Sequence, residues 1–80
     1  MRRLTPRQRQ IIELASTGLS ARQIGTELGI SYHTVRTQET HILRRMRARN
    51  MTEACVKYDR ERAEIEAAEL LRARIMREVG

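Results

Sequence analysis

Two short amphipathic segments meet at Leu28-Gly29-Ile30-Ser31, and this junction constrains the fold more than any other part of the sequence. The first segment begins at Ser20, a residue that favours the N-cap of a helix. Gly29 is expected to end it, because glycine readily takes the left-handed conformation found at helix ends. Ser31 can then cap a second helix. The sequence therefore predicts a helix, a tight turn and a helix.

Two further helices flank this pair. Thr5, Pro6 and Gln8 form a capping box with proline at the first helical position, and Gly18 predicts the end of a helix over about 6–17. Thr52 is the expected N-cap of a last helix over about 53–79, roughly 40 Å long at about 1.5 Å per residue. With a third helix over about 32–47, the chain is expected to be all-α, with four helices and a long last one.

The charge of the chain is unevenly distributed. Residues 1–50 hold ten arginines and three acidic residues, whereas residues 51–80 hold six basic and seven acidic residues. A basic front of this kind favours a polyanionic partner, and the alternative is an ordinary solvated surface.

Several classes of protein are not supported by the sequence. Cys55 is the only cysteine, which fits a reducing compartment, and with His33 and His41 it cannot supply a zinc site at useful spacing. No apolar run approaches a membrane span, and no apolar stretch follows the basic start as in a signal peptide. Both histidines lie on one predicted helix, without an acid pair or a glycine-rich loop. Neither enzymatic activity nor a cofactor or metal is expected.

The helix predicted over residues 32–47 has two distinct sides. Its apolar stripe is expected to be buried and consists of Val35, Ile42, Leu43 and Met46. A second face is cationic and begins at His33. The other members of this face lie three, four, seven and eleven residues further on, a spacing that keeps side chains on one side of a helix: Arg36, Thr37, Thr40 and Arg44. Arginine on such a face can bind O6 and N7 of guanine, and threonine offers a hydroxyl and a methyl group. The alternative is an ordinary exposed polar face. Glu39, close to the apolar stripe, has no clear role in this pattern.

Six short elements are spread over the region from Leu4 to Tyr58, and their order and spacing match a known pattern without insertions or deletions. They are Leu4-Thr5-Pro6-Arg7, Gly18-Leu19-Ser20, Ile24 with Leu28-Gly29-Ile30-Ser31, Thr34-Val35, Ile42-Leu43 and Thr52-Glu53-Ala54. In this order they resemble the helix-turn-helix DNA-binding domain of the LuxR/GerE family of bacterial regulators. The resemblance implies a four-helix domain whose third helix enters the major groove of double-stranded DNA. It also implies that the fourth helix forms a two-fold dimer.

The resemblance also implies roles for single residues. Three positions match base-contacting or groove-contacting sites of the family: Arg36, Thr37 and Thr40. Three others match positions close to the DNA backbone: His33, Thr34 and Arg44. Six further arginines of the front are best treated as phosphate contacts that give salt-dependent affinity, with simple solubility as the alternative: Arg2, Arg3, Arg7, Arg22, Arg45 and Arg49.

The sequence departs from the family pattern at several positions. Family members usually have Glu at positions 8 and 10, where this chain has glutamine, and His at Gln38. They usually have Gly at Arg47 and often Arg near Met51, and Gly25 takes the place of a common Ala. The base preferences of other family members therefore do not transfer to this chain.

Residues 59–80 extend beyond the resemblance and are expected to continue the last helix. An apolar stripe on this helix is expected to meet a dimer partner or another protein, and it consists of Tyr58, Ile65, Ala68, Leu71, Ile75, Met76 and Val79. Glu61 and Arg72 interrupt the heptad-like seam, so a long regular coiled coil is not expected. A homodimer is favoured, since a two-part DNA site needs two-fold symmetry, while folding back on the same chain and binding another protein stay open.

Residues 1–58 are thus predicted to be a helix-turn-helix DNA-binding domain, and residues 59–80 an extension for dimerisation or partner binding. The expected function is a transcription regulator that binds double-stranded DNA sequence-specifically, as a dimer on an inverted repeat. It is expected in the bacterial cytoplasm, on the nucleoid, and without a sensor or phosphoacceptor domain it suits a phage or mobile element. The alternative is a protein-interaction module that docks through its last helix on RNA polymerase or another regulator, including a piece resembling sigma-factor region four.

Overall fold

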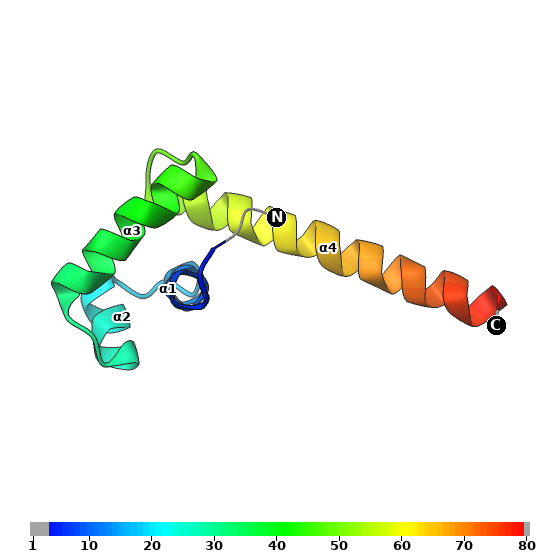
Figure 1. Cartoon of the computed structure of the whole chain (residues 1–80), viewed down its shortest axis with the longest axis horizontal. Coiled ribbons are helices and arrows are strands. Elements are labelled where there is room, and N and C mark those ends of the chain that lie inside the picture. Colours follow the sequence, from blue (N-terminus) through cyan, green and yellow to red (C-terminus); the bar gives the residue numbers. More distant parts are fainter. Residues whose placement is uncertain (1–3, 80) are drawn as a thin grey trace.

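The computed structural model describes residues 4–79, and these form four α-helices and no strand. The helices are α1 (Pro6–Ser16), α2 (Ala21–Leu28), α3 (Tyr32–Met46) and α4 (Met51–Val79). Helices α1 to α3 gather around the first turns of α4, and the rest of α4 projects away from them as a single rod (Figure 1). The predicted all-α, four-helix architecture with a long last helix is confirmed.

The helix starts follow from local hydrogen bonds. Thr5 and Ser20 each form a complete capping box, in which the cap hydroxyl and the side chain three residues later bond each other's backbone amides. The Ser31 hydroxyl accepts the Thr34 amide at 3.0 Å. Gly29 ends α2 in the left-handed conformation, with φ 68°. The predicted turn between α2 and α3 is therefore present.

The predicted start of α4 is wrong. The sequence predicts Thr52 as the N-cap, but the helix begins at Met51, and the side-chain oxygen of Asn50 accepts the Glu53 amide at 2.8 Å. Asparagine is as good an N-cap as threonine. Arg47, at the end of α3, takes a left-handed conformation with φ 52° and redirects the chain just before this cap.

The core is aliphatic, and its largest fully buried side chains are Ile11, Ile12, Ile24, Val35, Ile42 and Met46. Within the predicted stripe of α3, only Leu43 is partly exposed. Helix α4 closes the core with Ala54 and Tyr58, which are 0% and 3% exposed. The Tyr58 hydroxyl donates to Glu13 at 3.1 Å and so fastens α4 to α1. Tyr58, expected at an interface with a partner, is thus a core residue of its own domain.

Gly25 brings α2 unusually close to the turn that follows it. Its carbonyl accepts the Ile30 amide at 3.0 Å. A Cβ atom at this position would lie 2.8 Å from the Ile30 carbonyl oxygen, closer than carbon and oxygen normally approach. The absence of a side chain therefore fixes the spacing between α2 and the start of α3.

The distal part of α4 has little cover. Of residues 59–78, only Glu61 and Ile65 are partly buried, and the exposed side chains include large apolar ones. The predicted continuation of the helix through residues 59–79 is confirmed. None of the described helices is both long enough and apolar enough to cross a membrane.

Candidate nucleic-acid interface

Helix α3 presents the polar face that its sequence predicts. The five side chains of that face are all exposed: His33, Arg36, Thr37, Thr40 and Arg44. Val35, Ile42 and Met46 point the other way and are at most 1% exposed. Because the core holds one side of α3, the other side is presented as a fixed, convex surface that suits the width of a DNA major groove.

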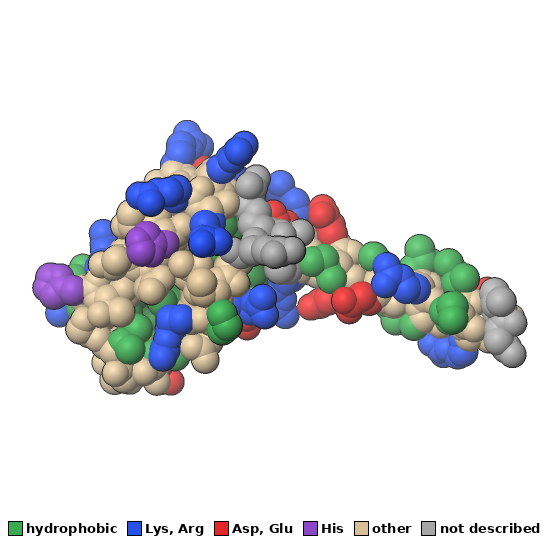
Figure 2. All heavy atoms as spheres, in the orientation of Figure 1, with side chains coloured by type: hydrophobic (Ala, Val, Ile, Leu, Met, Phe, Trp, Pro, Cys, Tyr) green, Lys and Arg blue, Asp and Glu red, His purple; other side chains and the backbone are tan. Residues whose placement is uncertain are grey.

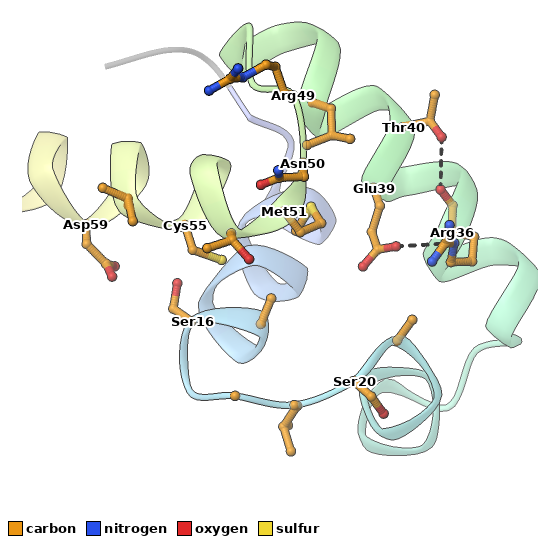
Figure 3. Close-up of a pocket in the computed structure, with 17 residues that line it drawn as sticks. Ser16, Ser20, Arg36, Glu39, Thr40, Arg49, Asn50, Met51, Cys55 and Asp59 are labelled. Atoms are coloured by element: carbon orange, nitrogen blue, oxygen red, sulfur yellow. Dashed lines mark hydrogen bonds and ion pairs between the residues drawn. The ribbon is translucent and has the colours of Figure 1, made fainter.

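Arg36 is held by an acidic neighbour on this surface. Its Nε lies 3.5 Å from Oε1 of Glu39, one helical turn away, and the side chains are 62% and 13% exposed respectively (Figure 3). Partial burial raises the pKa of the Glu39 carboxyl above its ordinary value, and the charge of Arg36 opposes this only in part. Glu39 had no role in the sequence pattern, although its spacing from Arg36 was a usable signal.

The threonines of α3 differ in what they can offer a ligand. The Thr40 hydroxyl donates to the Arg36 carbonyl at 3.2 Å, which leaves its methyl group and oxygen lone pairs for a base edge (Figure 3). Thr34 is part of the N-cap, with its hydroxyl 2.9 Å from that of Ser31. Thr37 is exposed between Arg36 and Thr40 along the helix. Thr37 and Thr40 therefore remain candidates for base contact, while Thr34 contributes mainly to the helix end.

A stacked arrangement brings α2 to the beginning of α3. The Arg22 guanidinium lies over the ring of Tyr32, 4.6 Å from its centroid, and the Tyr32 ring meets that of His33 edge-on at 5.9 Å. Such a cation–π contact restrains arginine without neutralising it. Arg22, His33 and Thr34 are thus brought together at the N-terminus of α3, where helix amides favour anions.

The remaining predicted phosphate contacts are spread over the domain. Arg44 and Arg45 are exposed in the last turn of α3, and Arg7 is exposed in the first turn of α1. Arg49 donates to Glu53 at 3.0 Å, although its side chain is 90% exposed. Arg2 and Arg3 lie outside the described residues. Basic side chains lie over the domain in Figure 2, and acidic ones gather where α4 leaves it.

Two departures from the family pattern meet in the structure. Gln8, only 4% exposed, donates from Nε2 to Oε1 of Gln38 at 3.2 Å. The same Gln8 accepts the Thr5 amide through Oε1. This contact holds the start of α1 against the middle of α3, so it supports the helix that carries the polar face.

A groove of about 760 Å³ runs beside the polar face of α3, between the end of α1 and the start of α4 (Figure 3). Arg36, Glu39 and Thr40 line one side of it, and Cys55, Val56 and other residues of α4 line another. Among residues 4–79, no three His, Cys, Asp or Glu side chains come together in a way that would hold a metal ion.

Comparison with known proteins places this geometry in a family. Residues 2–58 match the family model of bacterial regulatory proteins of the luxR family, GerE. A solved structure titled as that of the transcription factor GerE has a TM-score of 0.67 at 28% identity, over 71% of this chain and 85% of the other. The chain belongs to the LuxR/GerE family. Helix-turn-helix domains of this family are DNA-binding regulators and not enzymes, as expected for this chain.

Two curated relatives are longer proteins. Nodulation protein W of Bradyrhizobium diazoefficiens is 36% identical over 50 residues, which is 62% of this chain and 22% of the relative. The nitrate/nitrite response regulator protein NarL of Escherichia coli K12 is 37% identical over 59 residues, which is 74% of this chain and 27% of the relative. The chain thus spans about a quarter of the length of these relatives.

Proposed function

We propose that the chain is a sequence-specific regulator of transcription that reads DNA bases with α3 and binds an inverted repeat as a dimer. The observation that carries this proposal is the exposed polar face of α3, set opposite a buried stripe within a helix-turn-helix domain of this family. Base contacts are assigned to Arg36, Thr37 and Thr40. Arg36 is suited to guanine, and the threonines to a base edge or a thymine methyl.

Contacts with the DNA backbone are assigned to the two ends of α3, to Arg22 of α2 and to α1. Arg22, His33 and Thr34 surround the N-terminus of α3, where a phosphate can also meet helix amides. Phosphate contacts elsewhere are assigned to Arg7, Arg44 and Arg45. These contacts position the domain and supply affinity that falls as salt rises, but they carry no sequence information.

The distal part of α4, residues 59–80, is assigned to dimerisation. Its exposed apolar side chains support this assignment, since Leu71 and Ile75 are 56% and 50% exposed. A two-fold dimer matches a two-part operator, because each domain can then read one half-site.

The proposed setting is the bacterial nucleoid, whether the gene belongs to a host or to a phage. RNA polymerase or another regulator is then a further partner of the DNA-bound dimer. The alternative of a protein-interaction module, including a sigma region four-like piece, is not favoured, because the family match covers the DNA-binding domain itself.

Selection of bound duplexes from a random library, at about 150 mM salt, tests the proposal, because weak surface electrostatics are screened there. An enriched inverted repeat with fixed half-site spacing is the expected result. Binding without any enriched motif, lost as salt rises, would show that the domain is only an electrostatic anchor.

Single variants then test the assigned roles on the selected duplex. Arg36→Ala is expected to reduce discrimination against the wrong base by about 1–3 kcal/mol. Arg7→Ala, the matched control, is expected to weaken selected and random DNA equally and to lower the salt slope by about 1. Because Arg36→Ala also releases the Glu39 carboxylate, both variants are made in parallel in a Glu39→Gln background. Equal losses from both arginines would remove Arg36 from the readout.

A further inference from the structure

The distal part of α4 carries an apolar seam without an occupant. Leu71, Ile75 and Met76 are 56%, 50% and 68% exposed. Ile65, Ala68 and Ile75 follow heptad-like spacing along one line of the helix, and Leu71 and Met76 flank this line on opposite sides. Residues 51–79 contain no glycine or proline and form one unbroken helix. The distal part therefore cannot fold back on its own domain without breaking that helix.

The charges of this segment divide along its length. Residues 59–69 contain five acidic residues and two arginines, a net charge of −3. Residues 70–78 contain three arginines and one glutamate, a net charge of +2. In Figure 2 the acidic side chains lie where α4 leaves the domain, and basic and apolar ones lie nearer its free end. The rod thus has a negative proximal half and a positive distal half.

A parallel, in-register pair of these helices would oppose like charges. Arg72 would meet Arg72 of the second copy in the seam, and Glu61 would meet Glu61. The two negative halves would also lie side by side. Like charges placed directly together disfavour an arrangement by several kcal/mol in a desolvated interface, which makes this pairing unfavourable.

An antiparallel pair removes these conflicts. The negative half of each helix then lies along the positive half of the other. In the register that sets Ile65 opposite Ile75 of the second copy, Arg72 comes opposite the small Ala68. Arg72 also comes within one position of Glu69 of the second copy, so the break in the heptad seam becomes a pair of opposite charges.

We propose that two copies of the chain pair through residues 61–79 of α4 as antiparallel helices, with Ile65 of each copy opposite Ile75 of the other. This pairing rests on the dimer of the proposed function and specifies its geometry. The interface is the seam through Ile65, Ala68, Arg72 and Ile75, flanked on one side by Leu71 of both copies.

The pairing sets the distance between the two DNA-binding domains. The two-fold axis passes near residue 70, so the Tyr58 residues of the two copies are separated by 24 helical rises, about 36 Å. The domains lie at opposite ends of the pair, beyond these residues. Half-site centres are therefore expected more than one turn of DNA apart, since a turn measures about 34–36 Å.

Cysteine cross-linking of the full-length chain tests the orientation. In a Cys55→Ser background, Ile65→Cys and Ile75→Cys chains, one of them tagged, are oxidised separately and as a mixture. A disulfide needs closely apposed Cα atoms, so the antiparallel register links the two different variants to each other. Strong homodimers of each variant alone would overturn the proposal in favour of a parallel pair. A chain that remains uncross-linked and monomeric in sedimentation at high concentration would also overturn it.

A charge exchange tests the register independently. Glu69→Arg is expected to weaken self-association about tenfold or more, because two arginines then approach each other at each site. The double variant Glu69→Arg/Arg72→Glu restores opposite charges and is expected to recover dimerisation. Failure of the double variant to recover, with helicity unchanged by circular dichroism, would contradict the register.

These results are separable from the fate of the proposed function. Parallel cross-links together with an enriched operator would reject the pairing and leave DNA readout intact. Antiparallel cross-links without any enriched operator would reject sequence-specific readout and leave the pairing intact.

Discussion

Glu39 limits the freedom of the side chain that is assigned to guanine. Its carboxylate lies 3.5 Å from Arg36, and it is the less exposed partner of the two. An isolated exposed pair of this kind contributes little to stability, but it favours one orientation of the guanidinium over others. In the proposed complex the same carboxylate faces the polyanionic DNA, so Glu39 is expected to oppose binding to any sequence while it orients Arg36.

Glu39→Gln is expected to stabilise the domain at neutral pH. Burial raises the pKa of Glu39 in the folded chain above its ordinary value of 4.5. The native state therefore holds more protons than the unfolded state between these two pKa values, and stability falls as pH rises through that window. The glutamine variant does not titrate at this position, so its free energy of unfolding does not fall for this reason. Urea unfolding of both proteins at pH 4 and pH 7 measures the difference in their free energies of unfolding. A stability advantage of the wild type that grows toward pH 7 would contradict the prediction.

The Gln8–Gln38 contact is a second pair whose members act together. Gln8→Glu keeps the capping box but places a carboxylate at a site that is 4% exposed. A negative charge near a helix N-terminus gains about 0.3–1 kcal/mol, whereas leaving a buried group poorly paired costs about 1–3 kcal/mol. Gln8→Glu alone is expected to destabilise the domain.

Adding Gln38→His to Gln8→Glu gives the new carboxylate a neighbouring side chain that can carry a positive charge. The double variant Gln8→Glu/Gln38→His is expected to recover most of the loss, with a coupling of about 0.5–3 kcal/mol between neighbouring residues. A double-mutant cycle by thermal unfolding measures this coupling. Strictly additive effects would show that the two side chains do not share an interaction.

Arg47 holds a conformation that suits glycine. Its φ of 52° is the only positive φ among the described residues that are not glycine. Arg47→Gly is expected to stabilise the domain by about 0.5–1 kcal/mol, since the left-handed penalty disappears while the unfolded chain becomes more flexible. Gly18→Ala, at φ 97°, is the control and is expected to act in the opposite direction. Thermal unfolding of both variants and the wild type tests this prediction. A melting temperature of Arg47→Gly below that of the wild type would contradict it.

At the scale of elements, the turn between α2 and α3 sets the direction in which α3 projects. Its two determinants are the left-handed Gly29 and the close approach of Gly25 to the Ile30 carbonyl. A left-handed glycine is common at helix ends, but at Gly25 the spacing of α2 and α3 depends on the absence of a Cβ atom.

Gly25→Ala is expected to reduce specific DNA binding more than it reduces helix content. Alanine gains about 1 kcal/mol of helix propensity, but its Cβ would meet a backbone oxygen that cannot rotate away, and overpacking costs about 1–3 kcal/mol. Movement of α2 relative to α3 relieves the clash and tilts the polar face. Glu27→Ala, at an exposed position of α2, is the control. Wild-type affinity for the selected operator in Gly25→Ala would contradict this role.

Local chemistry made most of the elements predictable. The capping boxes of Thr5 and Ser20 and the left-handed Gly29 depend on residues within a few positions. The start of α4 was missed because Asn50 and Thr52 are both good caps, and the choice depends on the turn at Arg47. The heptad pattern places Tyr58 at an interface, because such a pattern does not reveal which turns of a helix are covered by its own domain.

The candidate site was only partly predictable for a similar reason. Helical periodicity alone placed the polar residues of α3 on one face. Periodicity does not report the contacts that Arg36 makes with Glu39 or that Gln8 makes with Gln38. Those contacts depend on rotamers and on packing between helices, which the sequence pattern does not specify.

At the scale of the whole molecule, basic and acidic regions are separated along the long axis. The front of the chain is strongly cationic, and the acidic residues are concentrated between that front and the free end of α4. This arrangement directs a polyanion to the domain and away from the middle of the rod, because like charges repel it there. The same acidic segment is the part that an antiparallel second copy would neutralise.

The continuity of α4 couples the direction in which the apolar seam faces to the orientation of the DNA-binding domain. One helix runs from the core at Ala54 to the seam beyond Ile65, so a residue added between Tyr58 and Ile65 turns the seam by about 100° relative to the domain. Seven added residues complete nearly two turns and restore the facing while lengthening the rod by about 10 Å. Operator choice is therefore expected to be lost on inserting one alanine and to return with seven, at a wider half-site spacing. The reading of DNA by two copies would then depend on angular phase as much as on chemistry.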